Sequence, residues 1–306
     1  MRTVDLVLPM NPGSRSDDRR MRIGMSSLVR YLDPACVGRL LIIVPDQVPK
    51  QAVRALTWEG CHVPYRTTVL HDREVIGANA WRTRVGSWYT QQFVKIGAAD
   101  HLESDFYVTL DSDVVLTKPT GFDDLVIGGR AATLYYGRDV HEQWWRASAQ
   151  ILGTEPRLER EGMGVTPAVL SGRVARGLMR YLEARLQGPW YRSVVDFIDD
   201  QKARGLYKPH GFMPSPAPTG YTLYYLFAEL SGLAALDHVK SDSLWCAQQV
   251  FRPEELLDLP ARLHTSASGP GRFFVLQSVL GASPEWVWAQ VAETFGLAAP
   301  LAATPR

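Results

Sequence analysis

Two aspartates that are one residue apart are the side chains of this chain whose type and spacing most directly suggest chemistry. Asp111 and Asp113 follow the mostly β-favouring run 106–110 and precede three further apolar residues. On extended backbone, residues i and i+2 project to the same side, so the two carboxylates would repel unless a cation lay between them. Carboxylate oxygens suit Mg²⁺ or Mn²⁺ and leave positions open for substrate phosphates. The pattern therefore predicts a divalent-metal site, and the alternative is an ordinary Asp-Ser-Asp turn after a strand.

A sheet must position these aspartates, and the first hundred residues predict one. Apolar runs alternate with amphipathic stretches along them, at Val4–Leu8, Met21–Tyr31, Leu40–Val44, Val48–Trp58 and His62–Leu70. Alternating strands and helices indicate a parallel sheet with right-handed crossovers. No GxGxxG follows the first strand, so the usual dinucleotide fingerprint is missing. The run Phe106–Leu110 reads as a central strand whose carboxyl end is where open α/β sheets bind ligands.

A long helix is predicted over Asn79–Ala99, directly before the aspartates. Gln92 lies on its apolar face, where a buried amide needs a partner, and Lys95 lies on the edge of that face. Lys95 could point a cation into a cleft, and Ser112 separates the two aspartates. We therefore take Gln92, Lys95 and Ser112 as candidate substrate-binding residues, with ordinary packing as the alternative for the first two.

Composition excludes some classes of function. The 306 residues are 46% hydrophobic, enough for a full core, and 33 Lys plus Arg against 32 Asp plus Glu leave a net charge of +1. That balance argues against nucleic acid as a partner. Cys36, Cys61 and Cys246 are isolated, which suits a reducing compartment, and no apolar run approaches a membrane span. We expect a cytoplasmic protein without a transmembrane segment.

The stretch Trp88–Lys95 followed by Phe106–Asp113 resembles glycosyltransferases of the GT-A fold, and in particular an uncharacterised bacterial GT-A-like family. The Asp-Ser-Asp segment is also similar to that of glycogenin and lipopolysaccharide galactosyltransferase-type enzymes. The resemblance implies an α/β, GT-A-like nucleotide-diphospho-sugar transferase fold, with a mostly parallel Rossmann-like sheet flanked by helices and a helix-rich C-terminal portion. It implies that Asp111 and Asp113 hold Mn²⁺ or Mg²⁺ against a nucleotide-sugar diphosphate.

The implied function is metal-dependent transfer of a sugar, of the hexosyltransferase type, from a nucleotide-diphosphate sugar to an acceptor hydroxyl. The acceptor is an unknown glycan, lipid-linked or small molecule, and the sequence leaves retention or inversion open. We expect residues 1–130 to form the nucleotide-sugar-binding half and residues 131–297 the acceptor-side half of one compact domain. Residues 298–306 form a flexible tail.

The second half contains further predicted elements. A strand is expected at Ala131–Tyr135, and helices are expected at Glu142–Leu152, Ser171–Leu186 and Trp190–Arg204. The proline-rich stretch His210–Gly220 is a loop or lid candidate before an apolar helix.

Two features of this half bear on the resemblance. His264 is loosely similar to a late histidine that completes the metal site in the galactosyltransferase type, which makes it a third candidate metal ligand. Gly220 stands directly before Tyr221, where the resembling group is expected to carry an acid that could act as general base. That departure leaves the base unassigned, with Glu229 and Asp200 as possible substitutes.

Two other classes of function fit the same residues. Asp111-Ser112-Asp113 also matches the nucleophile motif of haloacid-dehalogenase-like phosphatases, in which Asp111 would attack phosphorus and Asp113 would act as acid and base. Such enzymes carry the motif after their first core strand, whereas about a hundred residues precede it here. The third class is a non-catalytic protein that binds nucleotide-sugar, which Gly220 favours.

Overall fold

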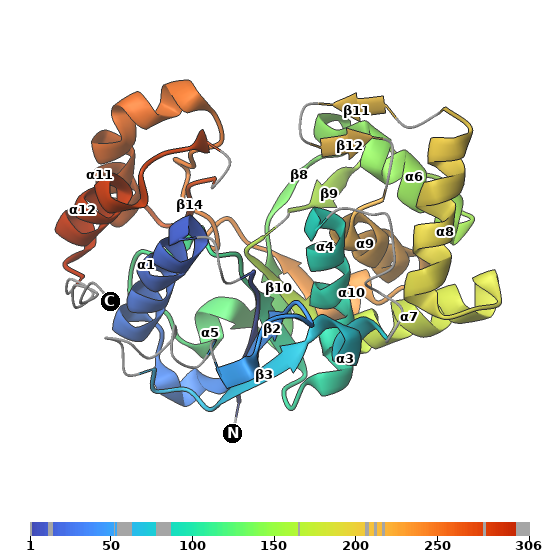
Figure 1. Ribbon diagram of the computed structural model, residues 1–306, viewed down its shortest axis with the longest axis horizontal. Coiled ribbons are helices and arrows are strands. Elements are labelled where there is room, and N and C mark those ends of the chain that lie inside the picture. Colours follow the sequence, from blue (N-terminus) through green and yellow to red (C-terminus); the bar gives the residue numbers. More distant parts are fainter. Residues whose placement is uncertain are drawn as a thin grey trace.

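The structure is a computed structural model that describes residues 2–11, 15–51, 53, 63–77, 87–164, 166–205, 208–210, 213–215, 218–277 and 280–297. It is built on a five-stranded sheet in the order β10-β4-β1-β2-β3 (Figure 1). The strands are β1 (Val4–Pro9), β2 (Val37–Val44), β3 (Thr67–His71), β4 (Phe106–Thr109) and β10 (Ala168–Ser171). The first four are parallel, and β10 runs antiparallel to β4. This confirms the predicted α/β class with a mostly parallel sheet flanked by helices.

Side chains alternate between the two faces of this sheet, as the period of a strand requires. Val7, Leu41 and Ile43 pack into one buried cluster, whereas Leu6 and Leu8 pack into another on the opposite face. Both faces are buried, which explains the uninterrupted apolar run 40–44 of β2 and the run 6–8 of β1. The strand predicted from His62 begins only at Thr67, so Pro64, which lacks an N–H donor, stays outside the ladder.

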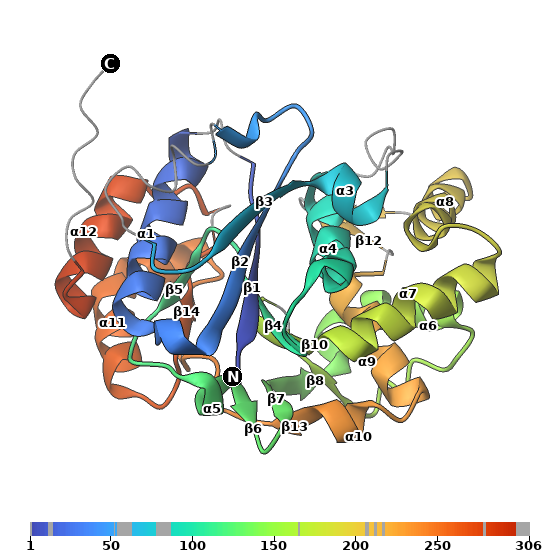
Figure 2. The ribbon, with the colours of Figure 1, turned by 90° about the horizontal axis from the view of Figure 1, so that it is seen from below.

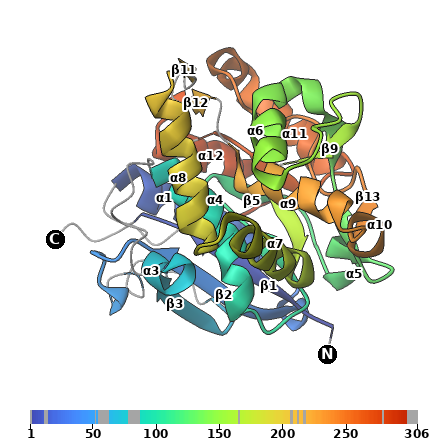
Figure 3. The ribbon, with the colours of Figure 1, turned by 90° about the vertical axis from the view of Figure 1, so that its right-hand side faces the viewer.

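Two groups of helices cover the two faces (Figure 2). One group consists of α1 (Arg15–Tyr31), α11 (Leu259–Ser268) and α12 (Pro284–Phe295). The other consists of α4 (Ser87–Gly97), α6 (Glu142–Leu152), α7 (Gly172–Leu186), α8 (Trp190–Ala203) and α9 (Gly220–Leu230). Figure 3 shows α4, α7 and α8 next to one another in this second layer. Each predicted helix of the second half is present to within one residue at either end.

Shorter elements complete the chain. The short helices are η1 (Pro34–Cys36), α3 (Asp72–Ile76), η3 (Ala98–His101), α5 (Phe122–Leu125), η4 (Arg138–His141), α10 (Ala234–Asp237) and η5 (Pro253–Asp258). A three-stranded sheet joins β13 (His238–Lys240), β7 (Arg130–Thr133) and β6 (Val126–Ile127). The strand pairs are β8 (Tyr135–Gly137) with β9 (Glu161–Met163), β11 (Lys208–His210) with β12 (Met213–Ser215), and β14 (Phe273–Val275) with β5 (Val114–Leu116). The halves on either side of residue 130 therefore interleave, because β10 pairs with β4 and β14 pairs with β5.

Several predicted segments differ from the observed elements or lie outside the described residues. Helix α1 begins six residues before the predicted start at Met21. The predicted helix over Asn79–Ala99 is described from Ser87, ends at Gly97 and continues as η3. The helix predicted at Val48–Trp58 and the tail 298–306 lie largely or wholly outside the described residues. The lid candidate is described at 210, 213–215 and 218–220, where it forms the end of β11, all of β12 and the start of α9. Within the described part of the chain, no helix is long and apolar enough to cross a membrane.

A buried histidine connects the three-stranded sheet β13-β7-β6 to the rest of the fold. His238 on β13 is 3% exposed, and its Nδ1 and Nε2 lie 2.9 Å from the hydroxyl oxygens of Thr133 and Tyr224 respectively. The Tyr224 hydroxyl in turn accepts a hydrogen bond from the Ser171 N–H at 2.7 Å. Burial lowers the pKa of His238 to about 4, although the neighbouring Asp237 carboxylate acts in the opposite direction. His238 is therefore neutral in the folded protein over the physiological range.

This histidine should make stability depend on pH. Between its usual pKa of 6.5 and about 4, the unfolded chain binds a proton that the folded chain does not bind. The free energy of unfolding should therefore fall as pH is lowered through this window, by about 3 kcal/mol for this residue. Urea unfolding between pH 7 and pH 4 should show a shallower dependence for His238→Gln than for the parent. The matched variant His264→Gln, at an exposed histidine, should retain the parent slope, and an unchanged slope in His238→Gln would contradict the assignment.

Candidate active site

The Asp-Ser-Asp turn lies at the carboxyl end of β4, the strand at which the parallel part of the sheet meets the antiparallel β10. The Leu110 N–H donates to the Val7 carbonyl at 2.9 Å, which extends the ladder to β1 by one residue. The Val114 N–H donates to the Asp111 carbonyl at 3.3 Å and closes the turn. The three turn residues are half-buried between fully buried neighbours. The aspartates therefore lie at the edge of the sheet where α/β folds bind ligands.

Helix α1 fixes the far side of the turn. A Cβ atom on Gly24 would lie 2.8 Å from the Val114 carbonyl oxygen, so this close approach requires glycine. One turn later, the Ser27 hydroxyl accepts a hydrogen bond from the Leu116 N–H at 2.9 Å. The same hydroxyl donates to the Gly24 carbonyl at 2.6 Å. These contacts hold β5, and with it Asp113, against the helix.

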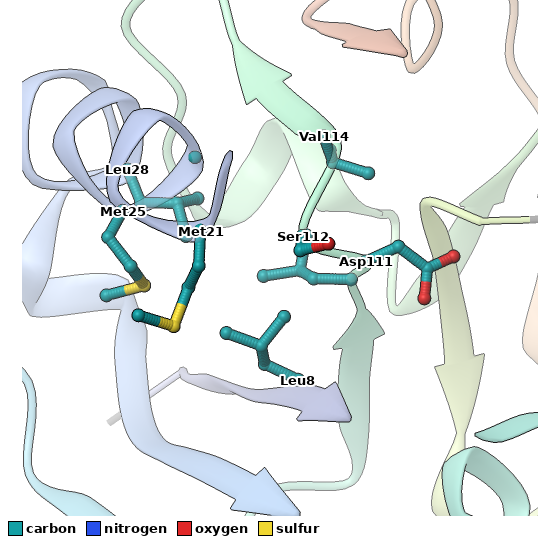
Figure 4. Close-up of a pocket in the computed structure, with 9 residues that line it drawn as sticks. Leu8, Met21, Met25, Leu28, Asp111, Ser112 and Val114 are labelled. Carbon is teal, nitrogen blue, oxygen red and sulfur yellow. The ribbon is translucent and has the colours of Figure 1, made fainter. Parts of the chain in front are cut away.

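A small pocket lies between α1 and the turn. It is lined by Leu8, Met21, Gly24, Met25, Leu28, Leu110, Asp111, Ser112 and Val114. Its volume of about 10 Å³ is close to the minimum for a single water molecule. Figure 4 shows that the Asp111 carboxylate points away from the methionines that line it. The pocket is therefore too small and too apolar to hold a nucleotide, and the carboxylate faces a different region.

The C-terminal segment folds back over the turn. Strand β14 pairs with β5, with Val275 opposite Val114, and the Leu276 N–H donates to the Asp113 carbonyl at 3.2 Å. His264, however, lies upstream on α11 and is exposed. Its neighbours Leu263 and Ser266 are buried, so the helix turns His264 to its outer side.

The structure therefore does not gather the three predicted metal ligands. Among the described residues, no group of three or more His, Cys, Asp or Glu side chains is placed to hold a metal ion. Asp111 and Asp113 remain together on their turn without His264. This donor set still fits Mg²⁺ or Mn²⁺, since such ions are often bound through one or two carboxylates with substrate phosphates and water as the other ligands.

Lys95 reaches the aspartates from α4. Its side chain is 1% exposed, and its Nζ donates to Asp111 Oδ1 at 2.6 Å and to Thr166 Oγ1 at 2.7 Å. Burial acts to lower the pKa of Lys95, but the charge of Asp111 and the hydrogen bonds outweigh it and raise the pKa above its ordinary value. Lys95 is therefore a buried ammonium whose counter-charge is the half-exposed Asp111 carboxylate.

A chain of hydroxyl groups extends from Lys95 into the core. Thr109 Oγ1 donates to the Ala168 carbonyl at 3.2 Å, so it must accept from the Tyr221 hydroxyl, which lies 2.7 Å away. Tyr221 in turn accepts from Thr166 Oγ1 at 2.6 Å, and Thr166 accepts from Lys95. The ammonium at one end and the carbonyl at the other thus set the direction of each bond. We call Thr166, Tyr221 and Thr109 the hydroxyl relay.

The sequence did not single out the hydroxyl relay, although partial signals were present. Thr109 is the last residue of β4 and lies two residues before Asp111, a spacing that on extended backbone places both side chains on one side. Tyr221 directly follows Gly220, where an acid was expected, and Thr166 lies two residues after Gly164, just beyond β9. Thr166, Tyr221 and Thr109 lie on three segments that are far apart in the chain. No sequence pattern indicated that their hydroxyl groups form one hydrogen-bonded chain that ends at the Lys95 ammonium.

Gly220 is explained by the packing of α9 on α4. A Cβ atom on Gly220 would lie 2.5 Å from the Gln92 carbonyl oxygen. The position is therefore closed to any side chain, which accounts for the missing acid in physical terms. Gln92 itself is 7% exposed, and its Oε1 has no hydrogen-bond partner among the described residues. The buried hydrogen-bond partner that the sequence predicts for the Gln92 amide oxygen is therefore not found in the described part of the chain.

The two substitute bases already have partners. Glu229 forms an ion pair with the Nη2 of Arg138, whose side chain is fully buried and stacks on Trp145 with 4.4 Å between the guanidinium carbon and the ring centroid. Asp200 pairs with Arg204 four residues later on the surface of α8, at 2.9 Å. Glu229 thus compensates a buried cation, and Asp200 forms a local helix pair. Neither is shown in contact with the aspartate turn.

The fold and the turn define an α/β protein with an acidic turn at the carboxyl edge of a mostly parallel sheet. The chain belongs to a family of unknown function, DUF6492, whose profile matches residues 1–299. No curated protein matches the sequence. The chain is similar in structure to mouse xyloside xylosyltransferase 1 in its apo form, with a TM-score of 0.48 and 13% sequence identity over 90% of this chain and 99% of that chain.

The close approach at Gly220 leads to a test. Gly220→Ala should lower the free energy of unfolding by about 1–3 kcal/mol, because its Cβ would meet backbone that cannot move aside cheaply. Gly220→Asp, which introduces the expected acid, should be destabilised further. Gly121→Ala is a suitable control, since the nearest atom to its Cβ lies 4.0 Å away. Thermal unfolding of the three variants measures this, and a stable Gly220→Asp protein would contradict the packing argument.

Proposed function

We propose that this protein is a metal-dependent glycosyltransferase that moves a hexosyl group from a nucleotide-diphosphate sugar to an acceptor hydroxyl. The observation that carries the proposal is the Asp111-Ser112-Asp113 turn at the carboxyl end of β4, with the Lys95 ammonium 2.6 Å from Asp111. Carboxylates with an adjacent buried cation suit a ligand that brings its own phosphates and a divalent ion. The resemblance of this segment to GT-A glycosyltransferases supports the same class.

In the proposed reaction, Asp113 and the free oxygen of Asp111 would hold Mn²⁺ or Mg²⁺, which supplies charge neutralisation for the departing nucleoside diphosphate. Lys95 holds Asp111 in place and adds positive charge beside it. Ser112, half-buried between the two aspartates, and Gln92, with its unpaired amide oxygen, are the candidates for hydrogen bonds to the donor. The acceptor hydroxyl would attack the anomeric carbon.

A non-catalytic nucleotide-sugar-binding protein is the second candidate. Three observations favour it: Gly220 is closed to an acidic side chain, Glu229 is paired with Arg138, and Asp200 is paired on the surface. No general base is therefore assigned. The phosphatase alternative fits less well, since the oxygen Oδ1 of its nucleophile Asp111 is already bound by Lys95 and β4 is not the first strand.

Binding is tested by removing one charge from the turn. Asp113→Asn should weaken Mn²⁺-dependent binding of UDP or GDP at least tenfold, which corresponds to about 1.4 kcal/mol. The melting temperature without ligand should change little, because Asp113 is half-buried on a turn. Asp123→Asn removes a surface carboxylate that pairs with the exposed Arg2, and should leave binding unchanged. Calorimetric titration measures both, and undiminished nucleotide affinity in Asp113→Asn would refute the metal assignment.

Catalysis is tested separately by incubating the protein with nucleotide-sugars and Mn²⁺. A transferase should release nucleoside diphosphate slowly to water and faster when the right acceptor is added. A binding protein should show Mn²⁺-dependent stabilisation by the same nucleotide-sugars without release. Release of inorganic phosphate from simple phosphomonoesters would instead establish the phosphatase class.

A further inference from the structure

We propose that Lys95, held by the hydroxyl relay, is a resident counter-ion of Asp111 that makes divalent-cation binding at the turn depend on a diphosphate-bearing ligand. This inference rests on the proposed function and deepens it. It concerns the order in which the metal and the donor bind and assigns a positioning role to Thr166, Tyr221 and Thr109.

The first argument is burial. Lys95 is 1% exposed, so water cannot solvate its charge, and Asp111 is the carboxylate bound to it at 2.6 Å. Removing the partner of a buried charge costs far more than breaking a surface pair. Asp111 is one-third exposed and could hydrate on its own, but the ammonium could not. Lys95 therefore holds Asp111 more firmly than a surface pair would.

The second argument is the relay behind the ammonium. Lys95 has three donors, of which one goes to Asp111 and one to Thr166. The Thr166 hydroxyl is committed to Tyr221, which is committed to Thr109 and from there to the Ala168 carbonyl. Because every donor along this chain is used in one direction, Thr166 can only accept from Lys95. The ammonium is thereby aimed at Asp111 by groups on three separate segments.

The third argument is the charge of the turn. Lys95 lowers the negative charge at the turn by one unit, because its ammonium lies beside Asp111. A free divalent cation is then attracted weakly and meets Asp111 with one oxygen already occupied. A diphosphate adds negative charge and oxygen ligands and can also be attracted by the ammonium. Metal and diphosphate should therefore each raise the other's affinity, as thermodynamic linkage requires.

The experiment measures Mn²⁺ binding by electron paramagnetic resonance, alone and with UDP or GDP, in the parent and in Lys95→Met. Methionine keeps most of the side-chain volume and removes the charge. In the parent, Mn²⁺ should bind weakly alone and at least about tenfold more tightly with nucleotide. In Lys95→Met, Mn²⁺ alone should bind at least about tenfold more tightly than in the parent, whereas nucleotide affinity at saturating Mn²⁺ should fall.

Two further variants complete the design. Lys240→Met removes an exposed lysine that pairs with Glu161 and should behave as the parent in every titration. Tyr221→Phe keeps the ring and removes one hydroxyl of the relay, so it should raise the affinity for Mn²⁺ alone by a smaller factor. Tyr221→Phe also serves as the test if Lys95→Met does not fold, which thermal unfolding reveals.

The outcomes separate this inference from the proposed function. Unchanged or weaker binding of Mn²⁺ alone in Lys95→Met, or in Tyr221→Phe if only that variant folds, overturns the counter-ion. If the parent binds nucleotide, equal Mn²⁺ affinity of the parent with and without that nucleotide overturns the counter-ion as well. If the parent binds no nucleotide with any metal, while Lys95→Met binds Mn²⁺ more tightly than the parent, the counter-ion stands and the glycosyltransferase proposal fails.

Discussion

The contact between α4 and α9 is the constraint on which the site depends. Gly220 lets the start of α9 lie directly against the Gln92 carbonyl, at a distance that no side chain would permit. Because α9 sits this close, Tyr221 reaches both Thr109 on β4 and Thr166 after β9. Those hydroxyls in turn fix the ammonium of Lys95, which begins its path on α4. A packing detail between two helices thus determines the electrostatics of the aspartate turn.

The same detail changes how the missing acid is understood. On sequence alone, glycine before Tyr221 is the absence of a catalytic group. In the structure, glycine is required at this position because α9 packs directly against the backbone of α4. Evolution of an acid at this position would require α9 to move away from α4, which would open the relay. An acidic side chain at position 220 and the close packing of α9 on α4 therefore exclude each other in this fold.

Strands buried on both faces and the place of the aspartates were predictable because local signals dominate there. The run at Leu40–Val44 is apolar in every position, Val4–Leu8 is apolar except at Asp5, and the aspartate pair directly follows another strand-like run. The second half was predicted as separate helices, and each is present. Its topology was not predictable, since nothing local in Ala168–Ser171 indicates pairing with β4. His264 was predicted as a metal ligand for a related reason: nothing local in the sequence indicates that α11 turns this histidine outwards.

The pairing of β14 with β5 also has a consequence for how the protein is made. The aspartate turn is synthesised about 160 residues before Phe273–Val275. Until then, β5 has no strand on its outer side, and the Asp113 carbonyl lacks the Leu276 N–H. A nascent chain can thus assemble the parallel strands early, but the edge of the sheet beside the aspartate turn remains unfinished until Phe273–Val275 has been translated.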